Sequence, residues 1–481
     1  MRTVAVYSEP DMESRHVTEA DEAYGIGPGE PSESYLNIPK LVQVAKKAGA
    51  EAVHPGYGFL AENPELARAC EDARIVFVGP KSKVLGKVAN KLESKKLVGK
   101  AGVPVIPGSS KQIIAVDDAE AEARRIGFPV LVKAVFGGGG RGMRVARNPR
   151  DLRKALEMAR VEAQTGFGRS ELYLEKYLES PRHIEVQILA GPRGKVVQLG
   201  ERECSLQRRY QKILEEAPSP ILTDKERKNL FNLALKVTRV THYENAGTVE
   251  FVRSKESQFY YLETNKRIQV EHLITEMVTG VDIVEEQLKI ASGEGLELSQ
   301  NEISSSGVAI NCRINAEDPT NGFAPSPGRV AKFVPPTGPG IRVDTALYDS
   351  CTVPEYYDSL IAKVASQGRN RSEAVKRMKI ALDEMVVDGV KTTVPVHQMI
   401  LDDRLFLRGQ YHTQLLDRLL DRWQPKQKVS PAEVAGICVA LSRVKRVAGT
   451  TATVDLGVVS RWRTGLQEPS SLRPALYIEG V

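Results

Sequence analysis

A run of four consecutive glycines, Gly137–Gly140, constrains the fold of this chain more than any other feature of the sequence. The segments before and after it, 128–136 and 143–146, both read as strands because they are rich in β-branched and apolar residues. Together with Gly142 the run formally satisfies GxGxxG, but that dinucleotide-binding motif must open a helix. The Gly-Lys-Ser/Thr ending of a P-loop is absent as well. The segment therefore predicts a glycine-rich β-hairpin rather than either nucleotide-binding fold.

The bare backbone amides of such a hairpin could close over the phosphate oxygens of a nucleotide. Lys133 on the entering strand would add a positive charge beside the glycines. A flexible loop with a purely structural role remains an alternative, although consecutive glycines cost conformational entropy that some function must justify.

Two further strands are expected at 248–252 and 259–265, and each carries a carboxylate in an apolar setting. Buried carboxylates must be paired with a cation or bind a metal ion. Glu250, Glu263 and the amide oxygen of Asn265 are hard oxygen ligands of the kind that Mg²⁺ prefers. These residues are therefore the candidate metal site.

Polarity keeps a period of two beyond the second of these strands. If the run is extended, one side of it carries Glu263, Asn265, Arg267, Gln269 and Glu271. By periodicity alone the row could equally be the solvated face of an edge strand. The nearby glycine hairpin and the facing carboxylates favour a phosphoryl-transfer site.

Two other polar segments stay open at this stage. The charged run 201–212 is typical of a solvated loop, yet Gln207 and Lys212 within it could meet an anionic substrate. His183 and Glu185 alternate as on a half-buried strand, where a lone histidine is more often structural than catalytic.

The 481 residues are enough for about three domains. The first 80 residues alternate strands with helices, which predicts a parallel sheet covered by helices, and the HPGYG segment at 54–58 follows a strand end as a ligand loop or a tight turn. Strands are expected at 309–314 and 329–334, with a helix whose core face carries Val375, Met378, Leu382 and Met385. We therefore expect an α/β and α+β chain with domains at 1–88, 89–303 and 304–423, and a linker and tail at 424–481.

The net charge of +6 comes without a basic run, which favours small anionic ligands over nucleic acid. No signal peptide and no apolar run of about 18 residues is present, so we expect a cytoplasmic protein without a membrane span. The five cysteines are far apart and predict free buried thiols rather than disulfides or a zinc site.

From Thr3 to about Trp423 the chain resembles the biotin carboxylases, which belong to the ATP-grasp superfamily. The likeness rests on several long motifs in the family's order: HPGYGFLAEN (54–63), VKAVFGGGGRGMR (132–144), EKYLESPRHIEVQ (175–187), ERECSLQRRYQK (201–212), ETNKRIQVEH (263–272), CRINAED (312–318) and PSPG (325–328).

The resemblance implies ATP-dependent carboxylation of biotin by bicarbonate through carboxyphosphate, with Mg²⁺ or Mn²⁺ as cofactor, as the first half-reaction of an acyl-CoA or pyruvate carboxylase. It also implies a glycine-rich lid at about 105–178 within the second domain. For ATP it implies phosphate contacts from Lys91, Lys133, Gly139 and Gly140, adenine contacts from Glu175, Lys176 and Leu178, and contacts near the ribose and phosphates from His183, Gln207 and Tyr210. The implied metal ligands are Glu250, Glu263 and Asn265. Bicarbonate would be seated by Lys212, Arg267, Gln269 and Val270, with Glu271 as its general base and Arg313 facing the ureido oxygen of biotin.

The sequence also departs from the family pattern. Tyr210 stands where the family usually has histidine, and Phe136 replaces the first glycine of a usual run of five. Lys266 and Leu273 replace the usual threonine and proline beside the base. The strand, Asn-Arg-Gly-Glu-Ile-Ala turn and helix that open family members have no counterpart, so we expect a gap in the N-terminal parallel sheet.

Nothing resembles the family's Ala-Met-Lys-Met biotinylation site, and the nearest segment is Arg377–Ile380. We therefore expect biotin to arrive on a separate carrier protein, a carboxyltransferase to complete the reaction, and a homodimer as in most of the family. Two alternatives stay open: an ATP-grasp ligase for another carboxylate, and an inactive assembly subunit that keeps the fold and binds the carrier.

Overall fold

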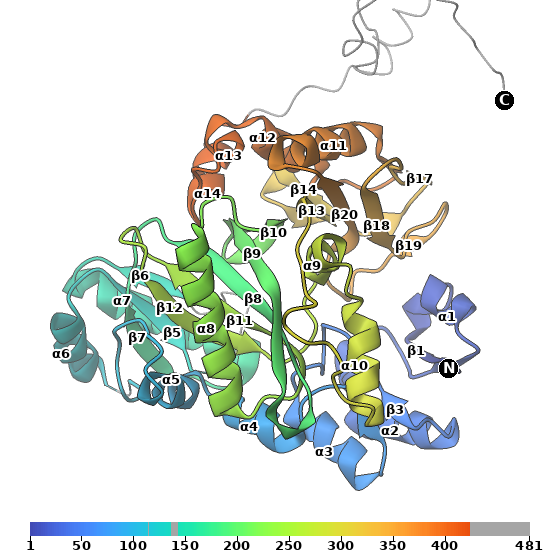
Figure 1. Cartoon of the computed structure of the whole chain (residues 1–481), viewed down its shortest axis with the longest axis horizontal. Coiled ribbons are helices and arrows are strands. Elements are labelled where there is room, and N and C mark those ends of the chain that lie inside the picture. The colour runs from blue at the N-terminus through green and yellow to red at the C-terminus, as the bar shows by residue number, and fades with distance from the viewer. Residues whose placement is uncertain (114, 136–142, 424–481) are drawn as a thin grey trace, which may run out of the picture. The chain divides into compact units, whose positions relative to one another are not determined.

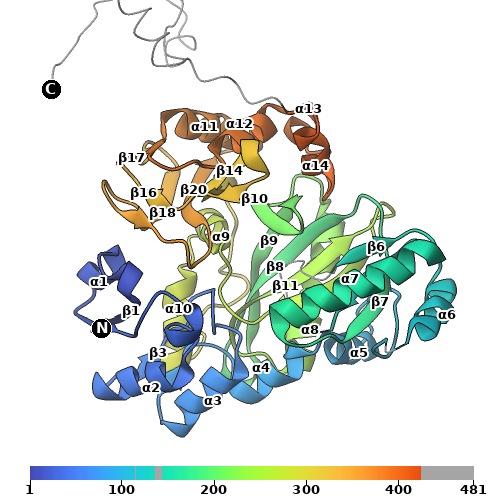
Figure 2. The same cartoon turned by 180° about the vertical axis from the view of Figure 1, so that it is seen from behind.

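The computed structural model describes residues 1–113, 115–135 and 143–423 (Figures 1 and 2). The predicted glycine hairpin with Gly139 and Gly140 lies outside the described residues, as do Phe136 and the tail at 424–481. No helix of the described part is long and apolar enough to cross a membrane. The cysteines of the described part are buried free thiols: Cys70, Cys204, Cys312 and Cys351.

The N-terminal segment forms two short parallel strand pairs instead of the single parallel sheet that we expected. Strand β1 (Val4–Tyr7) pairs with β2 (Glu22–Gly25), and β3 (Ala52–Val53) pairs with β4 (Val76–Phe77). Within the described residues the two pairs do not join into one sheet. The surrounding helices are α1 (Arg15–Glu19), α2 (Ile38–Lys47), α3 (Pro64–Asp72) and α4 (Ser82–Ala89), with 3-10 turns at Glu9–Asp11 and Pro31–Glu33.

A small antiparallel sheet follows, in the strand order β6-β5-β7. Its core is apolar side chains that the strands share with two amphipathic helices, among them Val132, Leu152 and Leu174. The pairing of Val132 with Arg144 confirms that the chain returns antiparallel after the glycines. The bounds are α5 (Lys91–Lys100), α6 (Val116–Ile126), β5 (Val130–Ala134), β6 (Arg144–Ala146), α7 (Pro149–Phe167) and β7 (Leu172–Lys176).

An eight-stranded antiparallel sheet, in the order β12-β11-β8-β9-β10-β13-β20-β18, forms the centre of the molecule and confirms the expected α+β architecture. Helix α8, which a Thr223–Glu226 capping box begins, covers one face of β8 and β9 (Figure 1). Because β10 pairs with β13, the sheet continues across the domain boundary predicted near residue 303. The bounds are β8 (Arg182–Ala190), β9 (Val196–Arg208), β10 (Gln211–Ala217), α8 (Asp224–Thr241), β11 (Asn245–Arg253), β12 (Phe259–Asn265), β13 (Val308–Asn315), β18 (Ile341–Thr345) and β20 (Leu360–Gly368).

The remaining elements enclose a second core between the end of this sheet and α11 (Arg371–Glu384). The predicted core residues Val375, Met378, Leu382 and Met385 are all buried there. The strand expected at 329–334 is broken between β16 (Gly328–Arg329) and β17 (Lys332–Val334), which pair with different partners. The other bounds are α9 (His272–Thr279), α10 (Ile283–Ser292), β14 (Glu317–Asp318), β15 (Ala324–Pro325), β19 (Thr352–Val353), β21 (Val386–Asp388), α12 (Val394–Asp402), α13 (Arg404–Leu407) and α14 (Leu415–Leu420), with 3-10 turns at Pro192–Gly194 and Pro319–Asn321.

Candidate active site

A cleft of about 920 Å³ lies between the small sheet and the large one and collects most of the predicted site residues. The HPGYG segment reaches it through Tyr57 and Gly58, as expected for a ligand loop. The predicted residues that line it are Lys91, Lys133, Glu175, Lys176, Leu178, His183, Gln207, Tyr210, Lys212, Glu250, Glu263, Asn265, Arg267, Gln269, Val270 and Arg313.

Lysines gather around buried carboxylates at the end of the cleft next to the small sheet. Lys133 Nζ lies 3.1 Å from Glu175 Oε2, and Lys91 Nζ lies 2.8 Å from Glu263 Oε2. Lys95, one turn after Lys91 on α5, also pairs with Glu175. Lys95 carries no prediction from the sequence, although its i,i+4 spacing from Lys91 places both on one face of the helix. Burial and the neighbouring lysines lower the pKa of Lys133 to about 7 and that of Lys95 well below its usual value. Nucleotide phosphates would supply the negative charge that holds these lysines protonated, so the group is suited to bind them.

Lys176 contacts the backbone in this structure. Its Nζ donates to the carbonyl oxygens of Gly127 and Phe128, at 2.8 and 3.0 Å. Lys176 therefore ties the end of β7 to the loop before β5.

The candidate metal ligands sit on adjacent strands. Glu250 of β11 pairs in register with Glu263 of β12, and Asn265 Nδ2 donates to Glu250 Oε1 at 2.7 Å. Burial alone would raise the pKa of Glu250, but Lys212 and His183 hold it well below its usual value. Burial likewise opposes the charge of Glu263, and Lys91 outweighs it, so its pKa is lowered. Two ionised carboxylates beside an amide oxygen are a donor set that fits Mg²⁺.

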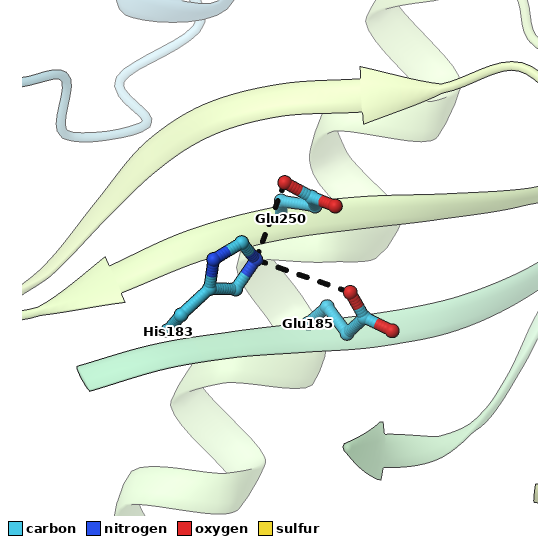
Figure 3. A group of neighbouring side chains, drawn as sticks. All are labelled: His183, Glu185 and Glu250. Atoms are coloured by element: carbon cyan, nitrogen blue, oxygen red, sulfur yellow. Dashed lines mark ion pairs between the residues drawn. The ribbon is translucent and has the colours of Figure 1, made fainter. Parts of the chain in front are cut away.

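His183, Glu185 and Glu250 form a second cluster of possible ligand atoms, all within 4.8 Å of one another. Figure 3 shows His183 Nε2 directed at both carboxylates, 3.2 Å from Glu250 and 3.9 Å from Glu185. Strand β8 is buried along its whole length, so the prediction of a half-buried strand here is wrong. Lys212 Nζ contacts both carboxylates, at 2.7 Å from Glu250, and supplies the positive charge of this cluster.

Glu271 is fully buried, at the residue before α9, and lies between two cations. Lys212 Nζ donates to its Oε1 and Arg313 Nη2 to its Oε2, each at 2.8 Å. Burial would raise the pKa of Glu271, but Lys212, Arg313 and Arg202 hold it well below its usual value. Arg313 is itself held by Glu215, whose Oε1 accepts from Nε at 2.6 Å. Glu271 itself is absent from the lining of the cleft within the described chain, whereas both of its cationic partners line it. An ionised carboxylate one side chain away from the cleft can accept a proton if a substrate displaces those partners.

The period-two row is correct in its members but wrong in its geometry. Strand β12 ends at Asn265, and residues 266–271 form a loop that leads into α9. Arg267 and Gln269 reach the cleft, and so does Val270, which strict alternation would have placed on the other side. Gln269 Nε2 donates to Glu250 Oε1 at 3.2 Å. A turn, rather than pleated backbone, therefore brings these side chains together.

The reading of 201–212 as a solvated loop is also wrong. These residues belong to the neighbouring strands β9 and β10, and most of β9 is buried. Burial is tolerated because the charges are paired, as for Arg202 Nε with Glu185 Oε1 at 2.6 Å. Tyr210 occupies the tip of the hairpin at a φ of 66°, is 42% exposed and lines the cleft. The sequence did not identify three further residues of this region as site residues, because their partners are distant in the chain. They are Arg202, Glu185 and Glu215.

Three family models match the chain in succession. The biotin carboxylase N-terminal domain matches residues 1–85, the ATP binding domain of the carbamoyl-phosphate synthase L chain matches residues 90–299, and the biotin carboxylase C-terminal domain matches residues 311–418.

Similar proteins cover most of the same chain. It is 47% identical over 418 residues to "Biotin carboxylase 1" of Bacillus subtilis, which spans 87% of this chain and 93% of the relative. It is 50% identical over 417 residues to a pyruvate carboxylase subunit of Methanothermobacter thermautotrophicus, which spans 87% of this chain and 85% of the relative. The biotin carboxylase domain dimer of Hydrogenobacter thermophilus 2-oxoglutarate carboxylase, solved with MgADP, ADP and bicarbonate, superposes with a TM-score of 0.85 at 46% identity, over 88% of this chain and 94% of that one. With three consecutive domain matches and this level of identity, the chain belongs to the biotin carboxylase family.

Proposed function

We propose that this chain carboxylates biotin with bicarbonate and ATP, releasing ADP and phosphate, as the first half-reaction of a biotin-dependent carboxylase. The observation that carries the proposal is Glu271, a buried ionised carboxylate held directly behind Lys212 and Arg313, which line the cleft. The names of the relatives and the ADP and bicarbonate bound in the Hydrogenobacter domain agree with it.

The cationic end of the cleft is the proposed site for the ATP phosphates. Lys91 and Lys133 each contact a carboxylate in this structure and can turn to a phosphate when nucleotide binds. Glu250, Glu263 and Asn265 are the proposed ligands of Mg²⁺, which supplies charge neutralisation at the β- and γ-phosphates when bound. We assign Glu175, Lys176 and Leu178 to the adenine, and His183, Gln207 and Tyr210 to the ribose and phosphates.

Glu271 is the proposed general base. Bicarbonate is a poor nucleophile until it loses its proton, and a carboxylate within hydrogen-bond reach can take that proton as the oxygen attacks the γ-phosphate. The attack forms carboxyphosphate and breaks the bond to ADP. Lys212, Arg267, Gln269 and Val270 are the proposed seat for bicarbonate. Arg267 suits this role because it lines the cleft and its ion pair with Glu62 is long, with 3.6 Å between the nitrogen and the oxygen.

Arg313 is the proposed contact to biotin. Carboxyphosphate breaks down to CO₂ and phosphate, and the phosphate can take the N–H proton of biotin while a cation stabilises the negative charge on the ureido oxygen. Arg313 is oriented for this by Glu215 and Glu271 and lines the cleft.

Partners and cell compartment follow from the same proposal. Biotin would arrive on a carrier protein, a carboxyltransferase would pass the carboxyl group to an acyl-CoA or a 2-oxo acid, and the chain would work as a cytoplasmic homodimer. The relatives named as carboxylase subunits and the dimeric Hydrogenobacter domain support an assembly of this kind.

The test is ADP release by the purified chain with ATP, Mg²⁺ and bicarbonate, with and without free biotin. We expect ADP release that requires bicarbonate and rises with biotin. ADP release independent of both would contradict the proposal, and carrier binding without any turnover would instead favour the inactive assembly subunit.

A further inference from the structure

Arg202 is a fully buried arginine behind the cleft, and none of the roles assigned above includes it. It lies on β9 opposite Glu185 of β8, and within the described chain it is absent from the lining of the cleft. Burying a guanidinium costs desolvation free energy unless ion pairs and hydrogen bonds offset that cost. The partners of Arg202 therefore indicate its role.

The guanidinium makes four side-chain hydrogen bonds that join four elements. Nε donates to Glu185 Oε1 at 2.6 Å, and Nη1 donates to Gln187 Oε1 at 2.8 Å and to Thr275 Oγ1 at 2.9 Å. Nη2 donates to Thr248 Oγ1 at 3.0 Å. Thr275 lies four residues after Glu271, in the first turn of α9. Arg202 thus ties the first turn of the helix that follows the proposed base to the middle of the sheet.

A chain of alternating charges leads from Arg202 to Glu271. The second oxygen of Glu185 accepts from Lys212, and Lys212 donates to Glu271 Oε1 at 2.8 Å. Several charged or titratable groups of the described chain face Glu271 from neighbouring strands. They are Lys212 and Glu215 on β10, Arg313 on β13, Arg202 and Cys204 on β9, and Glu185 on β8. Glu250 on β11 is linked to Glu271 through Lys212, and the helix that follows Glu271 carries His272 and Glu276. Without Arg202, Glu185 and Glu250 would be left to Lys212 and His183, and Lys212 is shared with Glu271.

We propose that Arg202 is a positioning residue, which acts through Glu185 and Lys212 to hold the proposed base Glu271 in place without touching any substrate. The inference rests on the proposed function, because it assigns a helper to the base of that reaction. It also explains why a sheet interior carries a guanidinium, since an apolar side chain there would leave Glu185 without a cation on one oxygen.

The test compares Arg202→Gln, which removes the charge, with Arg202→Lys, which keeps the charge but not the planar fork. For Arg202→Gln we expect kcat to fall about tenfold or more, with the KM for ATP within about twofold of the parent. Glu271, whose pKa lies well below its usual value, stays ionised across the assay range even if the loss of Arg202 raises that pKa by about one unit, so the readout is the split between kcat and KM together with rescue by the conservative variant. For Arg202→Lys we expect a kcat between those of Arg202→Gln and the parent.

Arg227→Gln is the matched control. Arg227 pairs with Glu201 at 2.9 Å, and Glu201 points to the face of β9 opposite to Arg202 because side chains alternate along a strand. We expect its kcat to equal that of the parent. A folded Arg202→Gln variant with the kcat of the parent, or an Arg202→Lys variant that recovers no kcat, would overturn the inference and leave Arg202 as a structural residue.

If neither Arg202 variant folds, Thr275→Val provides a second test of the inference. It preserves the charge and removes one of the acceptors of Arg202, so kcat should fall severalfold with the KM for ATP unchanged, and an unchanged kcat would overturn the inference. Absence of bicarbonate-dependent ADP release from the unmodified chain would be a different failure. It would refute the proposed function, and the inference with it.

Discussion

Glu271→Gln removes the proposed base with the smallest change of shape that the chain allows. Glu271 accepts two hydrogen bonds from cations, each 2.8 Å long, and is fully buried. Glutamine keeps one oxygen acceptor but turns its NH₂ group toward the second cation. Because charge-assisted hydrogen bonds contribute about 1.5–3 kcal/mol each, we expect the free energy of unfolding to fall by about 2–3 kcal/mol. Loss of a general base costs about 10²–10⁴-fold in rate, so kcat should fall by that factor.

The assay is ADP release at saturating ATP, Mg²⁺, bicarbonate and biotin, with ADP affinity measured by calorimetry on the same preparation. Nucleotide affinity should be nearly unchanged, because Lys91 and Lys133 contact other carboxylates. Glu276→Gln is the matched control: it lies on the same helix and pairs with Arg342 at 2.7 Å, away from Glu271. We expect it to keep the turnover of the parent. A Glu271→Gln variant with more than about half of the parent's turnover would refute the role of Glu271 as base.

Three further predictions concern other parts of the chain. Burial lowers the pKa of His397 to about 4, compared with about 6.5 for an ordinary histidine. Between pH 6.5 and pH 4 the unfolded chain therefore binds a proton at this residue that the folded chain does not bind. The free energy of unfolding should fall by up to about 3 kcal/mol over this range as the pH is lowered. His397→Gln should abolish that part of the acid sensitivity in urea unfolding at pH 7 and pH 5; an equal loss in both proteins would contradict it. Glu263→Gln removes a proposed metal ligand and should raise the Mg²⁺ concentration for half-maximal turnover at least about tenfold, and an unchanged requirement would exclude Glu263 from the site. Tyr210→His adds a cation at the cleft below pH 6.5 and should lower the KM for ATP about two- to fivefold there but not at pH 8.5; the same KM at both pH values would place residue 210 away from the phosphates.

Local patterns predicted the elements whose neighbours are close in the sequence. The apolar spacing of Val375, Met378 and Leu382 matched the buried face of α11, because a helix repeats every 3.6 residues whatever surrounds it. The strands β11 and β12 were expected from their composition and are joined by a short turn, so their pairing is nearly local. The facing of Glu250 and Glu263 could be anticipated for that reason.

Predictions failed where burial depends on partners that are far away in the chain. The run 201–212 has the composition of a solvated loop, and only its pairing with β8 and β13 places it inside the sheet. The prediction of a single N-terminal sheet was wrong for a related reason. Strands of two to four residues do not indicate by themselves which neighbour they pair with.

By itself the sequence determined the family likeness, the residue types of the candidate site and most of the local elements, because motifs and periodicity are properties of short stretches of chain. Only the tertiary structure decided that Glu271 lies between Lys212 and Arg313, which are 59 and 42 residues away from it, and that Arg202 supports this group from inside the sheet. The physical reason is that the charge state of a buried carboxylate depends on the distance to its counter-charges in space and on the exclusion of water between them, and neither quantity follows from separation along the chain.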